Sequence, residues 1–474
     1  MTICLICEGC YPYVVGGVSS WIQQLITAMP ERKFIIYAIG ASKTIKGKFK
    51  YIIPDNVIEI REIFLEDVLN EQPAKIEISI PQWAKEEIAD LLLGKSDNWG
   101  KLFRFFNDMP YEVSDFLMTS DFYDIAEIVY KSSYEHSIFV DFLWTLRSMY
   151  MTLFYVLKQL PPEADLYHSV STGYAGVAGA MGKYFFGSPY ILTEHGIYTR
   201  EREEEIIKAN WIPGDFKDLW VDFFYNMSRC TYAFTDKTIA LFEANSEIQS
   251  GMGCAKEKQL VISNGINPED FENLPKKNEN DDSINVGAII RVVSIKDIKT
   301  MLYSFDIVKR EIPNAKFYIM GPTEEDPEYY EECLDVLDSL GTNDVVFTGR
   351  ISVKDYINKM DMLVLTSISE GMPLSVIEAM AASKPNVTTN VGSCKELLYG
   401  RKDDKLGECG IVAPVMDNEG IADAIITLCK SEELRLKMGS IGNKRLRKYY
   451  TEKQFKDAYK KLYASYDNKV EFTS

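Results

Sequence analysis

Two glutamates, Glu370 and Glu378, are separated by seven residues in the segment EGMPLSVIE. Carboxylates accept hydrogen bonds from hydroxyl groups, so one glutamate could hold a hexose and the other a ribose. The alternative is an acid that caps a helix and a second acid on the solvated face of that helix. The spacing alone leaves both interpretations open.

A helix is expected to begin between these glutamates, after a strand at residues 362–366. Pro373 suits the first helical turn, where its missing N–H group is not needed. The free N–H groups of Met372, Leu374 and Ser375, together with the helix dipole, predict an anion site at this turn.

Two cations, Arg291 and Lys296, follow the strand expected at residues 285–290. Cations at the carboxyl end of a parallel strand face the crevice of an α/β sheet and suit a diphosphate. Two solvated surface cations are the alternative when this pair is taken alone. The glutamates and the glycine pair Gly16-Gly17 favour the diphosphate, because two glycines at a helix N-terminus let the backbone approach a ligand closely.

His195 is one of only three histidines in the chain. It lies at the end of an expected strand, precedes a glycine and opens a charged loop. α/β proteins bind ligands at this end of their strands, so His195 is a candidate functional residue. A lone histidine is more often structural, and His168, which also ends a strand, is the weaker candidate.

The elements that must position these residues alternate between strands and helices in two blocks. A strand at 3–7, a glycine loop, a helix at 18–29 and a strand at 33–39 form a βαβ opening. Residues 60–160 have few strand signals and helical stretches such as 99–109 and 115–130, which predicts a helical insertion. Residues 275–282 (PKKNENDD) predict a linker, and a long helical pair is expected at 432–466.

The second block predicts a doubly wound α/β domain. Its strands are expected at residues 285–290, 316–320, 344–348, 362–366, 385–389 and 410–413. Its helices are expected at residues 297–311, 327–340, 353–359 and 374–382. The expected domains are residues 1–275, residues 276–450 and a C-terminal helix, 451–474, that packs back on the first domain.

Composition excludes several classes of protein. The 474 residues include 52 basic and 70 acidic side chains, which gives a net charge of −18 and argues against nucleic-acid binding and against a polybasic membrane anchor. No apolar run is long enough to span a membrane, and the N-terminus lacks the basic region of a signal peptide, so we expect a cytoplasmic protein.

Metal binding is not expected either. Cys4, Cys7 and Cys10 form C-x2-C-x2-C, but residues three apart on a strand point to opposite faces, and no nearby fourth ligand completes a set. The chain has no D-x-D motif, which fits a diphosphate neutralised by Arg291, Lys296 and a helix dipole rather than by a metal ion.

The combination of E-x7-E, R-x4-K and an N-terminal glycine pair resembles the retaining glycosyltransferases of family 4, which have the two-domain GT-B fold. Two longer stretches, EGCYPYVVGGVSSW at 8–21 and EHGIYTRER at 194–202, resemble the PelF subgroup of that family, the cytosolic transferases of Pel exopolysaccharide synthesis. The resemblance implies an α/β protein with two Rossmann-like domains facing a cleft, the first on the acceptor side and the second binding the nucleotide sugar.

The resemblance also implies roles for individual residues. Arg291 and Lys296 match the pair that binds the diphosphate, Glu370 the acid that contacts the donor sugar, and Glu378 the acid that holds the ribose. His195 matches the histidine near the reacting sugar. The remaining donor-binding positions implied are Gly17, Ile351, Gly371, Met372, Pro373 and Leu374, with the Ile351 backbone meeting the uracil.

The expected function is therefore metal-independent hexosyl transfer, with retention, from UDP-glucose or a UDP-N-acetylhexosamine to a growing exopolysaccharide such as Pel. No cofactor is expected. The partners implied are the UDP-sugar, a carbohydrate acceptor and a membrane polysaccharide synthase complex that could recruit the chain to the inner face of the membrane. Three alternatives stay open: a family-4 transferase of another donor or acceptor, of glycogen, sucrose or glycolipid type; a UDP-sugar 2-epimerase-like enzyme; and a non-enzymatic scaffold that binds sugar nucleotides.

Overall fold

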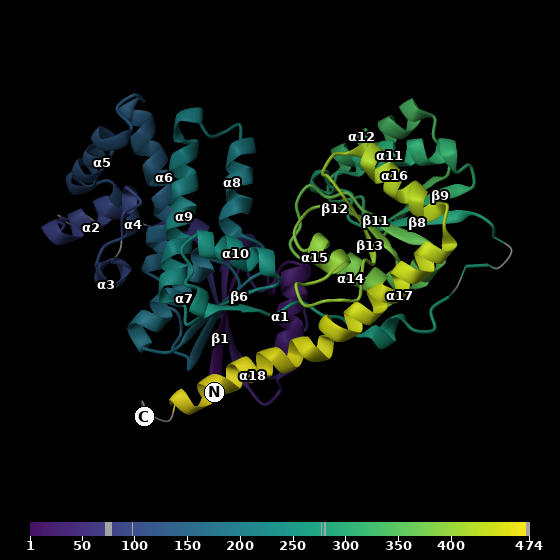
Figure 1. Cartoon of the computed structure of the whole chain (residues 1–474). Coiled ribbons are helices and arrows are strands. Elements are labelled where there is room, and N and C mark those ends of the chain that lie inside the picture. The colour runs from purple at the N-terminus through teal and green to yellow at the C-terminus, as the bar shows by residue number, and fades with distance from the viewer. Residues whose placement is uncertain (72–77, 97, 276, 279–280, 471–474) are drawn as a thin grey trace. The chain divides into compact units, whose positions relative to one another are not determined.

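The computed structural model describes residues 1–71, 78–96, 98–275, 277–278 and 281–470 (Figure 1). The chain divides into two compact units. The first contains Met1–Val261 together with the C-terminal residues from Tyr459 onward, and the second is Ile262–Ala458. Residues 276, 279 and 280 of the expected linker, and residues 471–474 of the expected C-terminal helix, lie outside the described residues.

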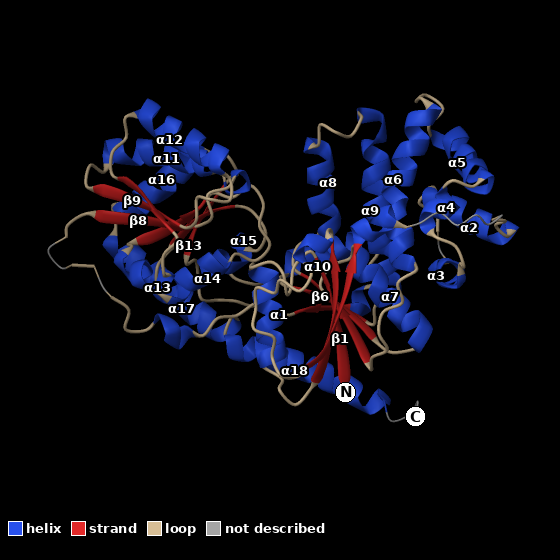
Figure 2. Cartoon of the chain, turned by 180° about the vertical axis from the view of Figure 1, so that it is seen from behind, coloured by secondary structure: helices blue, strands red, loops and turns tan. Residues whose placement is uncertain are grey.

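The first unit is built on a parallel sheet of seven strands in the order β3-β2-β1-β4-β5-β6-β7. The strands are β1 (Thr2–Glu8), β2 (Lys33–Gly40), β3 (Val57–Phe64), β4 (Leu166–Ser169), β5 (Tyr190–Glu194), β6 (Lys237–Ala240) and β7 (Gln259–Val261). The central strands are nearly continuous apolar runs because helices cover both faces of a parallel sheet (Figure 2).

Helices of the first unit fall into two groups. Those that accompany the sheet are α1 (Gly17–Thr27), α7 (Tyr174–Phe186), α8 (Tyr198–Lys208), α9 (Lys217–Phe234) and α10 (Glu243–Gly251). The helical insertion, which is confirmed, consists of α2 (Gln82–Leu92), α3 (Trp99–Asp108), α4 (Val113–Leu117), α5 (Ser120–Ser133) and α6 (Phe139–Leu157). The insertion and the sheet helices share one core of aromatic and aliphatic side chains.

Two expectations for this region are wrong in detail. Residues 57–64 form the edge strand β3, whose charged residues Glu59, Arg61 and Glu62 interrupt the apolar pattern that would have revealed it. The single helix expected at 115–130 is divided into α4 and α5, because Thr119 caps α5 by accepting a hydrogen bond from the Phe122 N–H group.

The second unit contains a parallel sheet of six strands in the order β10-β9-β8-β11-β12-β13. The strands are β8 (Ile284–Ile289), β9 (Ala315–Met320), β10 (Val345–Gly349), β11 (Met362–Leu365), β12 (Asn386–Thr389) and β13 (Gly410–Ala413). The helices are α11 (Ile298–Glu311), α12 (Pro327–Leu340), α13 (Val353–Tyr356), α14 (Leu374–Ala381), α15 (Cys394–Tyr399), α16 (Asn418–Cys429) and α17 (Glu432–Tyr449), followed by α18 (Glu452–Val470), which ends in the first unit.

The strand order of the second sheet determines where a ligand can bind. The chain leaves β8 in one direction towards β9 and returns on the other side as β11, so the loops after β8 and β11 diverge at their carboxyl ends. Ligands of open α/β sheets bind at such a switch point. The two parallel sheets with their covering helices confirm the α/β class with two Rossmann-like units.

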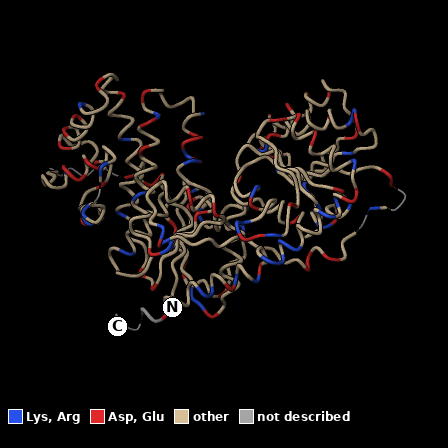
Figure 3. Tube along the Cα trace, viewed as in Figure 1, with Lys and Arg blue, Asp and Glu red and all other residues tan. Residues whose placement is uncertain are grey.

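Figure 3 shows acidic residues spread along the trace of both units. Within the described ranges, every helix is too short or too polar to cross a lipid bilayer.

Candidate functional site

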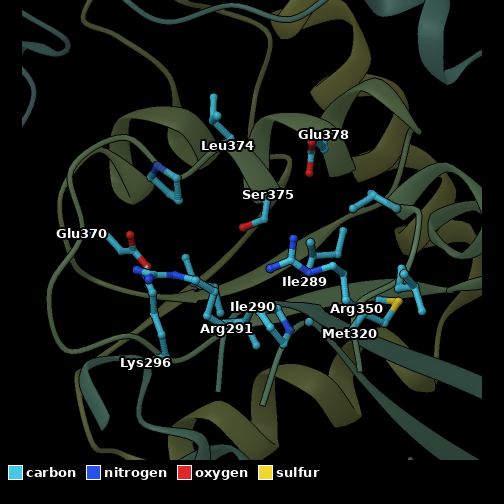
Figure 4. Close-up of a pocket in the computed structure, with 16 residues that line it drawn as sticks. Ile289, Ile290, Arg291, Lys296, Met320, Arg350, Glu370, Leu374, Ser375 and Glu378 are labelled. Atoms are coloured by element: carbon cyan, nitrogen blue, oxygen red, sulfur yellow. Dashed lines mark hydrogen bonds and ion pairs between the residues drawn. The ribbon is translucent and has the colours of Figure 1, made fainter. Parts of the chain in front are cut away.

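The second unit contains a cavity of about 380 Å³ at the carboxyl ends of its central strands (Figure 4). Its volume lies within the range of roughly 300–1,000 Å³ typical of small-molecule sites. Eight residues singled out from the sequence line it: Arg291, Lys296, Ile351, Glu370, Pro373, Leu374, Ser375 and Glu378. Gly371 and Met372 are not among the lining residues. The cavity therefore brings together the E-x7-E and R-x4-K residues, which are about 80 positions apart in the chain.

Lys296 and Glu370 form an ion pair at one end of the cavity, with 2.5 Å between Lys296 Nζ and Glu370 Oε1. Both side chains are largely buried, at 16% and 11% exposure. Ser367 Oγ donates a second hydrogen bond to the same carboxylate oxygen, at 2.6 Å. The hydroxyl group of Thr366 donates to the carbonyl oxygens of Lys296 and Asp297, which ties the loop after β11 to the loop after β8.

Arg291, unlike Lys296, forms an exposed ion pair. Its Nη1 lies 2.6 Å from Glu325 Oε2, and the two side chains are 56% and 40% exposed. Exposed ion pairs of this kind contribute at most about 1 kcal/mol. Arg291 can therefore exchange Glu325 for an anionic ligand at small cost.

The turn before α14 has one feature that differs from expectation. Pro373 is the N-cap residue, with φ −70° and ψ 115°, and the helix begins at Leu374, so Pro373 does not belong to the first helical turn. The turn is positioned by Gly392, whose φ of +50° brings its backbone against Glu370 and Gly371. A Cβ at Gly392 would lie only 2.2 Å from the Gly371 carbonyl oxygen. This glycine was not foreseen, because only the folded chain reveals the close approach.

Glu378 lies towards the other end of the cavity, on α14 (Figure 4). Burial raises the pKa of its carboxyl group to about 7, although the positive charge of Lys354 opposes the shift. Within the described residues, no side chain or backbone group donates a hydrogen bond to it. Glu378 thus offers a hydrogen-bond acceptor to the cavity that it lines.

Arg350 also lines the cavity and was missed by sequence reasoning. It directly follows β10 and is exposed, and in the described part of the chain no carboxylate pairs with it. Its place at a strand's carboxyl end, in the run Thr348-Gly349-Arg350, is the signal that could have identified it. Arg350 adds a third cation to the cavity wall.

The remaining two candidates lie in the first unit. Gly17 is the first residue of α1 and Gly16 is its N-cap; a Cβ on either would meet no heavy atom within 4 Å. The backbone here is therefore open to a ligand.

His195 follows β5 and packs edge-on against Trp21, with ring centroids 4.7 Å apart. Burial lowers the pKa of His195 to about 4, so the ring is neutral at pH 7. Its Nε2 is buried and has no hydrogen-bond partner among the described residues.

His168 is fully buried, and both of its ring nitrogens have hydrogen-bond partners. Its Nδ1 lies 2.7 Å from the Tyr463 hydroxyl group and its Nε2 lies 2.8 Å from Thr193 Oγ1. Burial lowers the pKa of His168 to about 3, with a smaller effect from His195. These contacts give His168 a structural role that joins β4 and β5 to the end of α18.

Metal ligands were not expected, and the described ranges contain no group of three or more His, Cys, Asp or Glu side chains placed to hold a metal ion.

Comparison with known proteins identifies the class of the molecule. Residues 268–445, which include the whole cavity, match the family described as "Glycosyl transferases group 1". The fold resembles that of HepE from Anabaena, crystallised in complex with UDP, with a TM-score of 0.62 at 14% identity over 98% of this chain and 100% of that one. The chain is a glycosyltransferase of the GT-B class. Residues 1–257, more than half of the 474, match the family described as "Domain of unknown function (DUF3492)", and the chain belongs to this family.

Two relatives show how far the sequence similarity extends. An uncharacterized glycosyltransferase of Methanocaldococcus jannaschii is 26% identical over 295 residues, which cover 61% of this chain and 72% of that protein. The N,N'-diacetylbacillosaminyl-diphospho-undecaprenol alpha-1,3-N-acetylgalactosaminyltransferase of Campylobacter jejuni is 27% identical over 241 residues, 48% of this chain and 60% of that enzyme. The alignment thus spans less than two thirds of the Campylobacter enzyme.

Proposed function

We propose that the chain is a retaining family-4 hexosyltransferase that uses a UDP-sugar and needs no metal ion. The observation that carries this proposal is the cavity of the second unit. It combines Arg291, Lys296 and the N-terminus of α14 with the free acceptor Glu378. Such a set of groups complements a nucleoside diphosphate linked to a sugar. HepE, which shares the fold, binds UDP, and this supports uridine as the nucleoside.

In this proposal the main catalytic effect is electrostatic. Arg291 and Lys296 stabilise the negative charge that develops on the diphosphate as the glycosidic bond breaks, and the α14 dipole adds to their effect. The backbone of the turn, from Gly371 to Leu374, lies beside the phosphates in this proposal, and the family resemblance assigns Gly17 to phosphate binding as well. The chain's own cations thus replace the metal ion that D-x-D enzymes use.

The two glutamates have separate roles in this proposal. Glu370, which Lys296 and Ser367 orient, accepts hydrogen bonds from the hydroxyl groups of the donor sugar. Glu378 accepts them from the ribose, and the Ile351 backbone contacts the uracil. His195, neutral at pH 7, contacts the reacting sugar. Retention then follows from attack on the face that the diphosphate leaves, without a covalent intermediate.

We further infer that the product is an exopolysaccharide of the Pel type. This inference is supported by the two PelF-like stretches at 8–21 and 194–202 and by the helical insertion. The acceptor is then a carbohydrate chain, and a membrane polysaccharide synthase complex is the partner that receives the product at the cytoplasmic face of the membrane.

The experiment is a donor panel. The protein is incubated with UDP-glucose, UDP-N-acetylglucosamine, ADP-glucose and GDP-mannose in excess chelator, and the released sugar is followed by proton NMR. We expect turnover of a UDP-sugar with the α-anomer formed first, and its loss in Arg291→Ala. The β-anomer as first product would refute retention, a 2-epimer would indicate the epimerase alternative, and activity only with added metal would refute metal independence. Binding of a UDP-sugar without any turnover would favour the scaffold.

A further inference from the structure

The loop between β2 and β3 is strongly basic, although the chain as a whole has a net charge of −18. It holds four of the chain's 52 Lys and Arg residues, all of them exposed: Lys43, Lys46, Lys48 and Lys50. No Asp or Glu occurs between residues 32 and 54. Lys43 pairs with Asp67, whereas no carboxylate of the described residues pairs with the other three. We call residues 43–52 the lysine loop.

Large apolar side chains are exposed among these lysines. In the lysine loop, Ile52 is 90% exposed and Phe49 is 36% exposed. In the neighbouring loop between β1 and α1, Val14 and Val15 are 50% and 67% exposed. Lysines interleaved with exposed apolar residues are typical of segments that adsorb to lipid bilayers, because the apolar groups enter the interface while the lysines stay at the headgroups.

Hydrogen bonds hold the two loops together as one surface. The Lys50 N–H group donates to the Pro12 carbonyl oxygen at 2.9 Å, and Gln23 Nε2 on α1 donates to the Ile52 carbonyl oxygen at 3.0 Å. The rings of Tyr13 and Phe49 are in contact, with centroids 5.7 Å apart. The lysines and the apolar side chains are therefore displayed by a fixed backbone.

We propose that the lysine loop and the adjoining Val14-Val15 segment bind the surface of a membrane that contains anionic phospholipids. Charge complementarity selects this occupant: three lysines without carboxylate partners meet anionic headgroups, and Ile52, Phe49 and Val15 enter the apolar boundary beneath them. The proposal concerns a surface of the first unit and does not depend on which sugar the enzyme transfers.

The test is vesicle flotation of the full chain. Vesicles of phosphatidylcholine that contain about 30% phosphatidylglycerol are compared with vesicles of pure phosphatidylcholine. We expect the chain to float with the anionic vesicles and to be released as salt shortens the range of electrostatic attraction. Each lysine near an anionic surface strengthens binding about fivefold, so the triple variant Lys46→Ala/Lys48→Ala/Lys50→Ala should bind about a hundredfold more weakly. Ile52→Ser, at a residue that is 90% exposed, should bind more weakly without a change in thermal stability.

A matched control removes the same charge elsewhere. Lys402, Lys405 and Lys437 are exposed lysines of the second unit without carboxylate partners in the described ranges. Their triple alanine variant has the same net charge, −18 − 3 = −21, and should bind like the parent. Equal binding of the two triple variants, or equal flotation with both kinds of vesicle, would overturn the proposal. Retention on an anionic polysaccharide without vesicle binding would also overturn it, because the surface would then bind a polyanionic chain.

Discussion

Glu378 should make the affinity for UDP depend on pH if its carboxylate binds the ribose. Burial raises the pKa of this group to about 7, so near neutrality a large fraction of the protein carries a protonated Glu378. An ionised carboxylate accepts hydrogen bonds from both ribose hydroxyl groups, whereas the protonated acid uses one oxygen as a donor, so we expect UDP to bind the ionised form. Each pH unit below the pKa then costs about tenfold in affinity, or roughly 1.4 kcal/mol.

The expected magnitude follows from the ionised fraction. With a pKa of about 7, this fraction falls from about three quarters at pH 7.5 to about 3% at pH 5.5, so the affinity should fall about 25-fold. At pH 6.5, binding should release about 0.8 proton per UDP. Calorimetric titration in two buffers of different ionisation enthalpy measures this release directly.

Glu378→Gln is the matched control, because the amide keeps the shape and one acceptor but does not titrate. The terminal phosphate of UDP also titrates near pH 6, as other phosphate monoesters do, and the variant reports that contribution alone. The difference between the two proteins isolates Glu378. Equal proton release and equal pH dependence in both proteins would refute the assignment of Glu378 to the ribose.

The other predictions concern the cations, the second glutamate and the core of the second unit. Arg291→Ala and Lys296→Ala should each weaken UDP binding by about 1.5–3 kcal/mol in calorimetry, and unchanged affinity in both would place the diphosphate elsewhere. Arg291→Ala should leave thermal unfolding unchanged because its ion pair is exposed, whereas Lys296→Ala should also lower stability because Glu370 loses a largely buried partner. Excess chelator should change UDP affinity by less than about tenfold, or 1.4 kcal/mol. Glu370→Ala should slow transfer strongly but leave affinity for plain UDP nearly intact, and an equal loss in Glu370→Ala and Glu378→Ala would contradict separate roles. Arg445→Met leaves the carboxylate of a fully buried ion pair without its partner, so it should lower the free energy of unfolding by about 3–5 kcal/mol in urea titration.

The sequence predicted the second unit better than the edges of the first. Its strands have clear apolar runs and alternate with helices, and the loops after β8 and β11 flank the switch point of the sheet, as the α/β class requires. This is why residues about 80 positions apart, such as Arg291 and Glu370, could be assigned to one site. The edge strand β3 escaped prediction because only one of its edges is paired, so its sequence could keep charges that a central strand would exclude.

Site residues that depend on tertiary contacts could not be read from local patterns. Arg350 comes from β10 at the edge of the sheet, and only the strand order shows that its loop reaches the cavity. Gly392 looks like an ordinary loop glycine until the turn at Glu370 packs against it. The lysine loop was hidden for a different reason, because a net charge of −18 says nothing about a local reversal of sign.

Both cations assigned to the diphosphate are already paired with glutamates in the structure, and the two pairs differ in what a diphosphate would do to them. The Arg291–Glu325 pair is about half exposed, so it contributes little free energy and a ligand can displace Glu325. The Lys296–Glu370 pair is largely buried, and removing either partner would leave an uncompensated charge at a cost of several kcal/mol. An ammonium group has three donors, however, so Lys296 can bind a phosphate oxygen while it keeps Glu370. A diphosphate should therefore displace Glu325 from Arg291 but leave Lys296 and Glu370 together, so that the cation on the leaving group also fixes the carboxylate that contacts the sugar.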